Sequence, residues 1–295
     1  MKTLIVEIIE PNRLGELVTA SREFCEIPDI VALGKEDIPG TYNKVYRSEE
    51  TVTANLVPAV TALIEKEGYE VVLLSASTIG AGLAGPLAVR LSAPFISEVT
   101  GIDSDFIVER PIYGGKAVAK YKINTKPVVL TIRRKYFERA ELEGVAQSVP
   151  LVVEDKTVSL ISEKEEKPEG IPLEDAEVII TGGRGIGGAD NFSMLYDTAN
   201  LFGGAVGASR GAVDEGWAQP TLQIGQTGKI VAPGIYLAVG VSGASQHLAG
   251  IANAKCVVAI NKDEDANIYN RARFGIVCDY KKIVPVLNEV LKEEL

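Results

Sequence analysis

The second half of the chain is built around one stretch, Gln223-Ile-Gly-Gln-Thr-Gly-Lys-Ile-Val-Ala-Pro-Gly-Ile-Tyr-Leu-Ala-Val-Gly-Val-Ser-Gly-Ala-Ser-Gln-His247. Its apolar centre, 235–239, lies between two polar loops that contain glycines. A strand followed by Gly240-Val-Ser-Gly243 and then a helix directs several backbone N–H groups at one point, where a phosphate is well held. Amide and hydroxyl side chains beside such a point favour a planar cofactor with polar edges over a metal, so we expect no metal site.

Outward from this stretch, short apolar runs alternate with helical patterns, and each run ends in a polar loop. The five expected strands are 178–181, 205–208, 235–239, 256–260 and 275–278. In an open parallel sheet, ligands bind in the crevice at the carboxyl ends of the strands. The polar side chains at those ends are Arg184, Ser209, Arg210, Ser242, Asn261 and Asp279.

Two helices complete this half of the chain. Asp190 is a candidate N-cap for a helix that runs to Phe202 and stops at Gly203-Gly204. The last helix is expected over 281–295, and Asp279 is a candidate N-cap for it. Both helices carry an apolar stripe at helical spacing, so each should cover the sheet.

The first half shows the same alternation. Strands are expected at 4–9, 30–33, 71–74, 94–97 and 128–133, and helices at 13–24, 52–67 and 81–91. Residues 106–122 predict an antiparallel excursion around Gly114-Gly115. The stretch Ser77-Thr-Ile-Gly-Ala-Gly-Leu-Ala-Gly85 lacks the ending of a Walker A loop, so close helix packing is its main interpretation, with a nucleotide site as the lesser one.

These patterns predict an α/β protein with two doubly wound domains and mainly parallel sheets. The amino-terminal α/β domain is expected at 1–165, and a Rossmann-like domain at 172–295. The charged, proline-containing stretch 162–172 is the expected linker between them.

The composition excludes several classes of function. A net charge of −10 and a pI near 4.9 argue against a nucleic-acid or anionic-membrane surface. No apolar run approaches the roughly 18 residues of a membrane span, and the first ten residues read as a strand and not as a secretory signal. Three widely spaced cysteines indicate a reducing compartment, the cytoplasm or an equivalent reducing space, with Cys256 and Cys278 as core residues.

A second interpretation of the cofactor comes from Gly183-Arg-Gly-Ile-Gly-Gly188, which matches G-x-G-x-x-G between a strand and a helix. Ser209-Arg210 follows the next strand, where an NAD site would have an acidic residue, so this logic points to NADP. An NADP-linked oxidoreductase subunit is therefore an alternative, and a regulatory nucleotide-binding subunit is a third.

The second half also resembles the FAD-binding domain of the alpha subunit of electron-transferring flavoproteins. The motifs that carry the resemblance are Gly182-Gly-Arg-Gly, Val206-Gly-Ala-Ser-Arg-Gly-Ala-Val-Asp214, Gln223-Ile-Gly-Gln-Thr-Gly-Lys229, Val241-Ser-Gly-Ala-Ser-Gln-His-Leu-Ala-Gly250, Ala259-Ile-Asn-Lys-Asp263 and Gly275-Ile-Val-Cys-Asp279. The first half resembles that family's amino-terminal domain, through Ala84-Gly-Pro-Leu-Ala-Val-Arg-Leu-Ser92 and Val99-Thr100. Ser245, Glu264 to Asn267 and Arg273 depart from the family's usual residues.

The resemblance implies FAD as the cofactor, with roles for individual residues. Arg210 would place a positive charge near the isoalloxazine ring and favour its anionic reduced forms. His247 would donate to the flavin carbonyl at C2, against the usual alternative of a hydrogen-bonded core histidine. Thr227 and Gln226 would approach the flavin N5 edge. The remaining contacts implied are Ile224 and Gly225 in the first loop, Ser242, Gly243, Ala244, Ser245 and Gln246 at the pyrophosphate and ribityl groups, Arg184 and Ser209 nearby, and Asn261, Asp279 and Tyr280 at the AMP end.

The resemblance also implies how such a protein works. None of these residues is a nucleophile or an acid–base pair, which suits an electron carrier better than a stand-alone enzyme. The family acts as a heterodimer with the electron-transferring flavoprotein beta subunit and exchanges electrons with partners such as acyl-CoA dehydrogenases. Some of its members belong to electron-bifurcating complexes, and the FAD domain of the family moves on its linkers.

Overall fold

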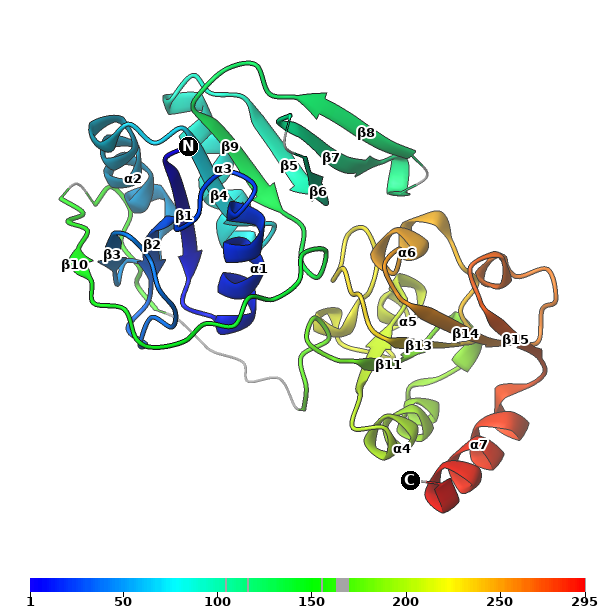
Figure 1. Cartoon of the computed structure of the whole chain (residues 1–295). Helices are drawn as coiled ribbons and strands as arrows, with labels where there is room; N and C mark the ends of the chain where they lie inside the picture. The colour runs from blue at the N-terminus through cyan, green and yellow to red at the C-terminus, as the bar shows by residue number, and fades with distance from the viewer. Residues whose placement is uncertain (104, 116, 155, 163–169, 295) are drawn as a thin grey trace. The chain divides into compact units, whose positions relative to one another are not determined.

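The computed structural model describes residues 1–103, 105–115, 117–154, 156–162 and 170–294. The chain forms two compact units, Met1–Lys164 and Glu165–Leu295, which we call the amino-terminal and carboxyl-terminal units (Figure 1). Residues 163–169 of the expected linker lie outside the described residues. Each unit has its own parallel sheet with helices on both faces, so the α/β class expected from the sequence is confirmed.

The amino-terminal unit contains a seven-stranded parallel sheet in the order β10-β3-β2-β1-β4-β9-β5. Its strands are β1 Thr3–Ile8, β2 Asp29–Leu33, β3 Val45–Ser48, β4 Val71–Ser75, β5 Phe95–Val99, β9 Val128–Ile132 and β10 Val149–Pro150. Its helices are α1 Pro11–Ser21, α2 Thr53–Glu67 and α3 Thr78–Arg90. The sequence did not predict β3 and β10, the two short strands at one edge.

Two apolar layers hold this sheet. One lies under α2 and α3, where Leu56 and Leu83 are fully buried, and the other lies under α1, where Leu14 is fully buried. The small-residue helix α3 packs as close to its strand as the sequence suggested. A Cβ on Gly80 would lie only 1.9 Å from the carbonyl oxygen of Ser75, and Ser77 caps the helix with its hydroxyl, so close packing accounts for this stretch.

The antiparallel excursion is confirmed. Strands β7 (Ile107–Ile112) and β8 (Ala117–Lys122) pair antiparallel across a short 3-10 turn, η1 (Tyr113–Gly115). A third strand, β6 (Gly101–Ile102), adds to the other side of β7. The three strands form a small sheet separate from the large one.

The carboxyl-terminal unit contains a five-stranded parallel sheet in the order β12-β11-β13-β14-β15. The strands are β11 Val178–Gly182, β12 Ala205–Ala208, β13 Ile235–Val239, β14 Cys256–Asn261 and β15 Phe274–Val277, so all five expected strands are present. The α-helices are α4 Ser193–Leu201, α5 Arg210–Asp214, α6 Ser245–Gly250 and α7 Tyr280–Glu294. The 3-10 helices are η2 Arg184–Ile186, η3 Ala189–Phe192, η4 Pro220–Leu222 and η5 Asn267–Asn270.

One helix start differs from its prediction. Asp190 is not an N-cap, because residues 189–192 form η3 and the α-helix begins only at Ser193. The Asp190 backbone carbonyl accepts the Ser193 hydroxyl at 2.8 Å, and its side chain is exposed. Asp279 does cap the last helix, since its carboxylate accepts the backbone N–H of Lys281 at 3.0 Å.

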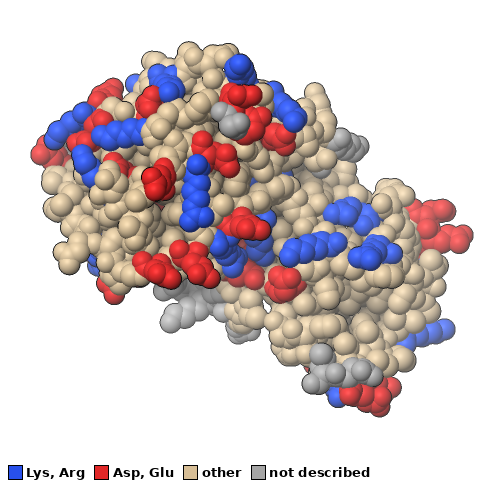
Figure 2. Space-filling view, viewed as in Figure 1, with Lys and Arg blue, Asp and Glu red and all other residues tan. Residues whose placement is uncertain are grey.

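The surface mixes both signs of charge. On the face shown in Figure 2, lysines and arginines lie among aspartates and glutamates. Over the described part of the chain, every helix is too short or too polar to cross a bilayer.

The ordering of the five strands creates a switch point between β11 and β13, because the chain leaves β11 toward β12 on one side and later returns to β13 on the other. The loops that follow these two strands touch through their backbones. Gly183 N–H donates to the carbonyl of Val239, and Gly185 N–H donates to that of Gly240, both at 2.9 Å. A Cβ on Gly183 would lie 2.1 Å from the Gly240 oxygen, so the contact requires glycine.

We therefore expect Gly183→Ala to lower the free energy of unfolding by more than about 2 kcal/mol, because the added methyl can fit only if backbone moves. Gly188→Ala is the matched control, since the nearest atom to its Cβ would be the Asn191 amide nitrogen at 3.6 Å. Urea unfolding of the two variants measures the difference. Equal stabilities would contradict the steric role of Gly183.

Candidate functional site

The residues expected at the ends of β11 and β12 lie together in the structure. Ser209 caps α5 by accepting the Ala212 N–H at 3.4 Å. Arg184, in η2, is exposed, and its Cβ would lie 3.4 Å from a Cβ on Gly211. Arg210 is exposed as well, with a side-chain exposure of 70% and its Nε 3.4 Å from the Asp214 carboxylate. Two arginines thus stand at this edge, and one of them has a partly exposed counter-ion.

The first polar loop, 223–229, is attached to the sheet and to α6 through its backbone. Ile224 N–H donates to the Ala208 carbonyl at 2.9 Å, and Gln226 N–H donates to the Gln246 carbonyl at 2.8 Å. Gly225 adopts a φ of +151°, which brings it against the backbone of α6. Gln226 and Thr227 are left exposed at the tip.

Two side chains of this loop have protein partners. The Thr227 hydroxyl accepts the Gln223 amide at 3.0 Å, which leaves its own O–H free to donate elsewhere. Lys229, at the end of this loop, is bonded to Glu174 at 2.8 Å. This salt bridge ties the loop to the segment that precedes β11.

The second loop, 240–244, leads from β13 into α6. Gly243 adopts a φ of +80°, and a Cβ there would lie 2.2 Å from the backbone nitrogen of Ile268, so the loop passes η5 at backbone distance. The Ser242 carbonyl accepts the Ile268 N–H at 3.2 Å. In this loop and the first turn of α6, the exposed residues are Ser242, Ala244, Ser245 and Gln246.

His247 is placed differently from its expected role. Only 6% of it is exposed. Its Nδ1 lies 3.0 Å from the Ile224 carbonyl oxygen, and its Nε2 lies 2.9 Å from the Tyr236 hydroxyl. Because a carbonyl can only accept, Nδ1 carries the proton and Nε2 accepts the tyrosine O–H. Both ring nitrogens have protein partners in this structure, so the expected hydrogen bond from His247 to a cofactor stays a prediction that requires one of these partners to be exchanged.

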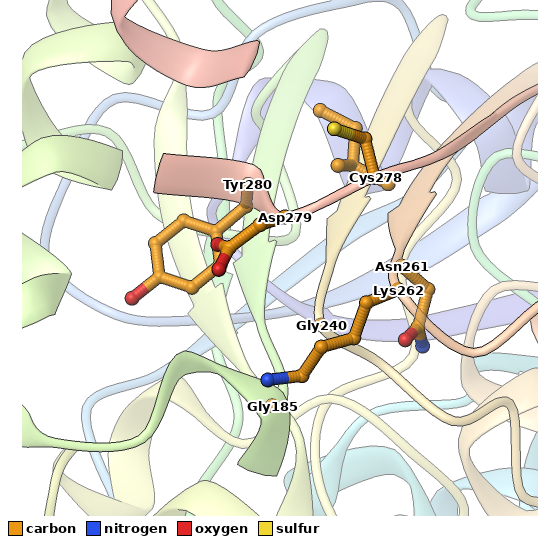
Figure 3. A pocket seen from close by; sticks show the side chains of 8 residues that line it. Gly185, Gly240, Asn261, Lys262, Cys278, Asp279 and Tyr280 are labelled. Atoms are coloured by element: carbon orange, nitrogen blue, oxygen red, sulfur yellow. The ribbon is translucent and has the colours of Figure 1, made fainter. Parts of the chain in front are cut away.

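A pocket opens at the carboxyl ends of β13, β14 and β15 (Figure 3). Three of the expected residues line it, Asn261, Asp279 and Tyr280, so the structure brings the predicted AMP-end residues together. Their polar atoms serve different purposes. Tyr280 donates its hydroxyl to the Ile186 carbonyl at 2.8 Å, and Asn261 donates its amide to that of Val241 at 3.0 Å, so these two side chains hold the loops that border the pocket.

Sequence reasoning missed several residues that line this pocket. Gly185 and Gly240 contribute backbone, and Lys262 contributes an exposed side chain that extends across the pocket in Figure 3. Cys278 lines it too. Cys256 and Cys278 are both half-buried, so their assignment to the core was wrong. The position of Lys262, directly after a strand end, was the available signal.

Burial governs the acid–base properties of the interior. It lowers the pKa of His247 to about 4, against a smaller opposite effect of the bond to Ile224. It raises the pKa of Tyr236, so the tyrosine keeps its proton. At neutral pH the pair is therefore uncharged, with the proton positions given by its two hydrogen bonds.

The donor set of this edge fits a dinucleotide. Glycine backbones line the pocket at the switch point, one carboxylate and one lysine side chain stand in it, and the exposed Arg184 directly precedes the lining residue Gly185. A carboxylate can accept ribose hydroxyls, and cations and backbone N–H groups can bind phosphates. Among the described residues, no group of three histidine, cysteine or acidic side chains could hold a metal ion.

Comparison with known proteins agrees with this geometry. Residues 172–252 match the family described as "Electron transfer flavoprotein FAD-binding domain", and residues 45–158 match "Electron transfer flavoprotein domain". The carboxyl-terminal unit is accordingly an FAD-binding unit of the flavoprotein class, which decides between FAD and the NADP alternative.

Individual relatives extend the match over most of the chain. It is 38% identical to the mitochondrial electron transfer flavoprotein subunit alpha of Dictyostelium discoideum, over 89% of this chain and 80% of the relative. It is 38% identical to subunit alpha of Bacillus subtilis (78% and 73%), and 35% identical to that of Mycobacterium leprae (94% and 93%). The chain belongs to the electron transfer flavoprotein subunit alpha family.

Because the pKa of His247 is lower in the folded protein than in the unfolded chain, the free energy of unfolding depends on pH. Between its folded-state pKa of about 4 and its unfolded value of 6.5, the unfolded chain binds more protons than the folded one. We expect roughly 3 kcal/mol of stability to be present above pH 6.5 and to be lost as the pH falls toward 4.

Because His247 is the only histidine in the chain, NMR of imidazole-labelled protein can follow its protonation directly. The midpoint should lie near pH 4, and the loss of stability should shrink in His247→Gln. An imidazole that titrates at its ordinary value in the folded protein would contradict the buried, neutral assignment.

Proposed function

We propose that the carboxyl-terminal unit holds one FAD at the switch point, and that the protein carries electrons between redox partners. The observation that supports this most directly is the pocket beside the two glycine loops, where Asp279 and Lys262 stand within reach of one dinucleotide end. FAD supplies the electron-transfer chemistry, since it accepts and gives single electrons. The side chains of the chain bind it, orient it and set the local charge.

The proposed role of each side chain follows from its position. Asn261, Lys262, Asp279 and Tyr280 surround the AMP end, with the Asp279 carboxylate as acceptor for ribose hydroxyls. The backbone of 242–246, with Arg184 and Ser209, serves the phosphates and the ribityl chain. The tip of the first loop, at Gln226 and Thr227, serves the flavin edge, because these polar side chains are exposed. Ile224, Gly225 and His247 form the wall behind that edge through their hydrogen bonds.

Arg210 is proposed as the cation beside the flavin ring. It is permanently charged, and as an exposed side chain it is free to turn from Asp214 toward a bound cofactor. A positive charge there stabilises negative charge gained on reduction.

The partners that we propose follow from the family. The electron transfer flavoprotein beta subunit is the proposed heterodimer partner, with the amino-terminal unit (1–165 in the sequence-based division) as the part that pairs with it. Acyl-CoA dehydrogenases are the proposed type of electron donor, and membership of a bifurcating complex is the narrower possibility within this proposal. The proposed compartment is the cytoplasm, in keeping with three cysteines that are all free thiols.

Cofactor binding can be tested at the pocket itself. Co-expressed with its beta subunit, the protein should purify yellow, and bound FAD should slow alkylation of Cys278 by N-ethylmaleimide at least tenfold, because the thiol lines the pocket. Cys25, half-buried in the amino-terminal unit, is the internal control and should react at an unchanged rate. Peptide mass spectrometry measures both rates. A complex that stays colourless with excess FAD, or a Cys278 rate that FAD does not change, would contradict the proposed site.

The role of Arg210 predicts a change in reduction potential. Arg210→Ala should lower the one-electron potential of the bound flavin by tens of millivolts, since a tenfold change in a one-electron equilibrium is about 59 mV. Arg210→Lys keeps the charge and is the matched control, which should lose less than half as much. Reductive titration followed by visible absorbance measures the potentials. A potential in Arg210→Ala equal to that of the wild type would remove Arg210 from the site.

A further inference from the structure

A buried polar chain connects the middle of the sheet to helix α6 and to the first loop. Tyr236 lies in β13 with none of its surface exposed, and it is among the largest fully buried side chains of the protein. Its hydroxyl lies 2.9 Å from His247 Nε2, and His247 Nδ1 lies 3.0 Å from the Ile224 oxygen. The chain therefore runs from strand β13, through helix α6, to the first loop.

The two hydrogen bonds fix the imidazole in one state. Ile224 offers only a lone pair, so Nδ1 must donate, and Tyr236 must then donate to Nε2. Apolar side chains surround the pair, including Ala238, Ile251 and Val257 of the same buried cluster. An imidazole nitrogen left without a partner in such surroundings would cost the desolvation energy of a polar group.

The chain ends where the proposed flavin edge begins. Ile224 precedes the exposed tip at Gln226 and Thr227, and its N–H is bonded to β12 through Ala208. His247 directly follows Gln246, whose carbonyl accepts the Gln226 N–H at 2.8 Å. The ring of His247 thus stands between the two loops and is bonded to one of them, while Tyr236 holds the ring from inside.

We propose that Tyr236 is a positioning residue for the cofactor, acting through His247 to fix the first loop relative to α6. The inference rests on the proposed function, because these two segments are the ones assigned to FAD. Tyr236 itself does not touch the cofactor, since its side chain has no exposed surface. Without the Tyr236 hydroxyl, the His247 ring is hydrogen-bonded only through Nδ1. The first loop at Ile224 then loses its fixed distance from α6.

The test begins with the wild-type full chain. Labelled with 15N at histidine, it should show one neutral imidazole in the Nδ1–H form, with an Nε2 signal typical of a hydrogen-bonded acceptor. A proton on Nε2 instead of Nδ1 would overturn the inference without any variant.

Binding of FAD is then measured in the complex with the beta subunit. Tyr236→Phe removes one oxygen and should weaken FAD binding about threefold to tenfold, the range expected for one buried hydrogen bond. Thr198→Val is the matched control, because Thr198 is equally buried and its hydroxyl bonds Asn288 at 2.8 Å, between α4 and α7. It should lose similar stability and keep wild-type FAD affinity.

A double-mutant cycle shows whether Tyr236 acts through His247. In the His247→Leu background, Tyr236→Phe should weaken FAD binding no further, whereas additive losses would overturn the inference. Unchanged FAD affinity in Tyr236→Phe, beside a wild type that binds FAD, would also overturn it and leave the proposed function standing. A wild-type complex that takes up no FAD would overturn both.

Discussion

The carboxyl-terminal unit depends on one steric constraint, the backbone contact between the loops that follow β11 and β13. Gly183 and Gly240 approach so closely that the Cβ of any other residue at 183 would collide with a carbonyl oxygen. This contact closes the sheet edge at its switch point and fixes where the polar ends of β12, β14 and β15 can meet. The pocket lies directly beside this contact, since Gly185 and Gly240 line it.

Around this contact, backbone hydrogen bonds hold the loops together with the side chains of Asn261, Tyr280 and His247. Gln226 binds α6 through its N–H, Ser242 binds η5 through its carbonyl, and Ile224 binds β12 through its N–H. The side chains at Gln226, Thr227 and Ser242 are consequently free to face a ligand. A flavoprotein that must bind one large cofactor tightly gains from such an arrangement, because the binding groups are in position before the cofactor arrives.

The sequence predicted much of this fold because buried parallel strands are short apolar runs that end at polar loops. All five strands of the carboxyl-terminal sheet follow that rule, whereas β3 and the edge strand β10 were missed because they are short and partly or fully exposed. Asp190 carried a capping signal, but the chain forms a 3-10 turn first. The partners of Lys229 and His247 could not be predicted, since Glu174 and Tyr236 come close only after the sheet has formed.

The burial of His247 has a consequence for a protein that passes electrons. Its imidazole is the side chain whose charge would ordinarily change near neutrality, and the fold withholds it from that change. Over the physiological pH range, the buried imidazole therefore adds no charge that changes with pH to the unit that holds it.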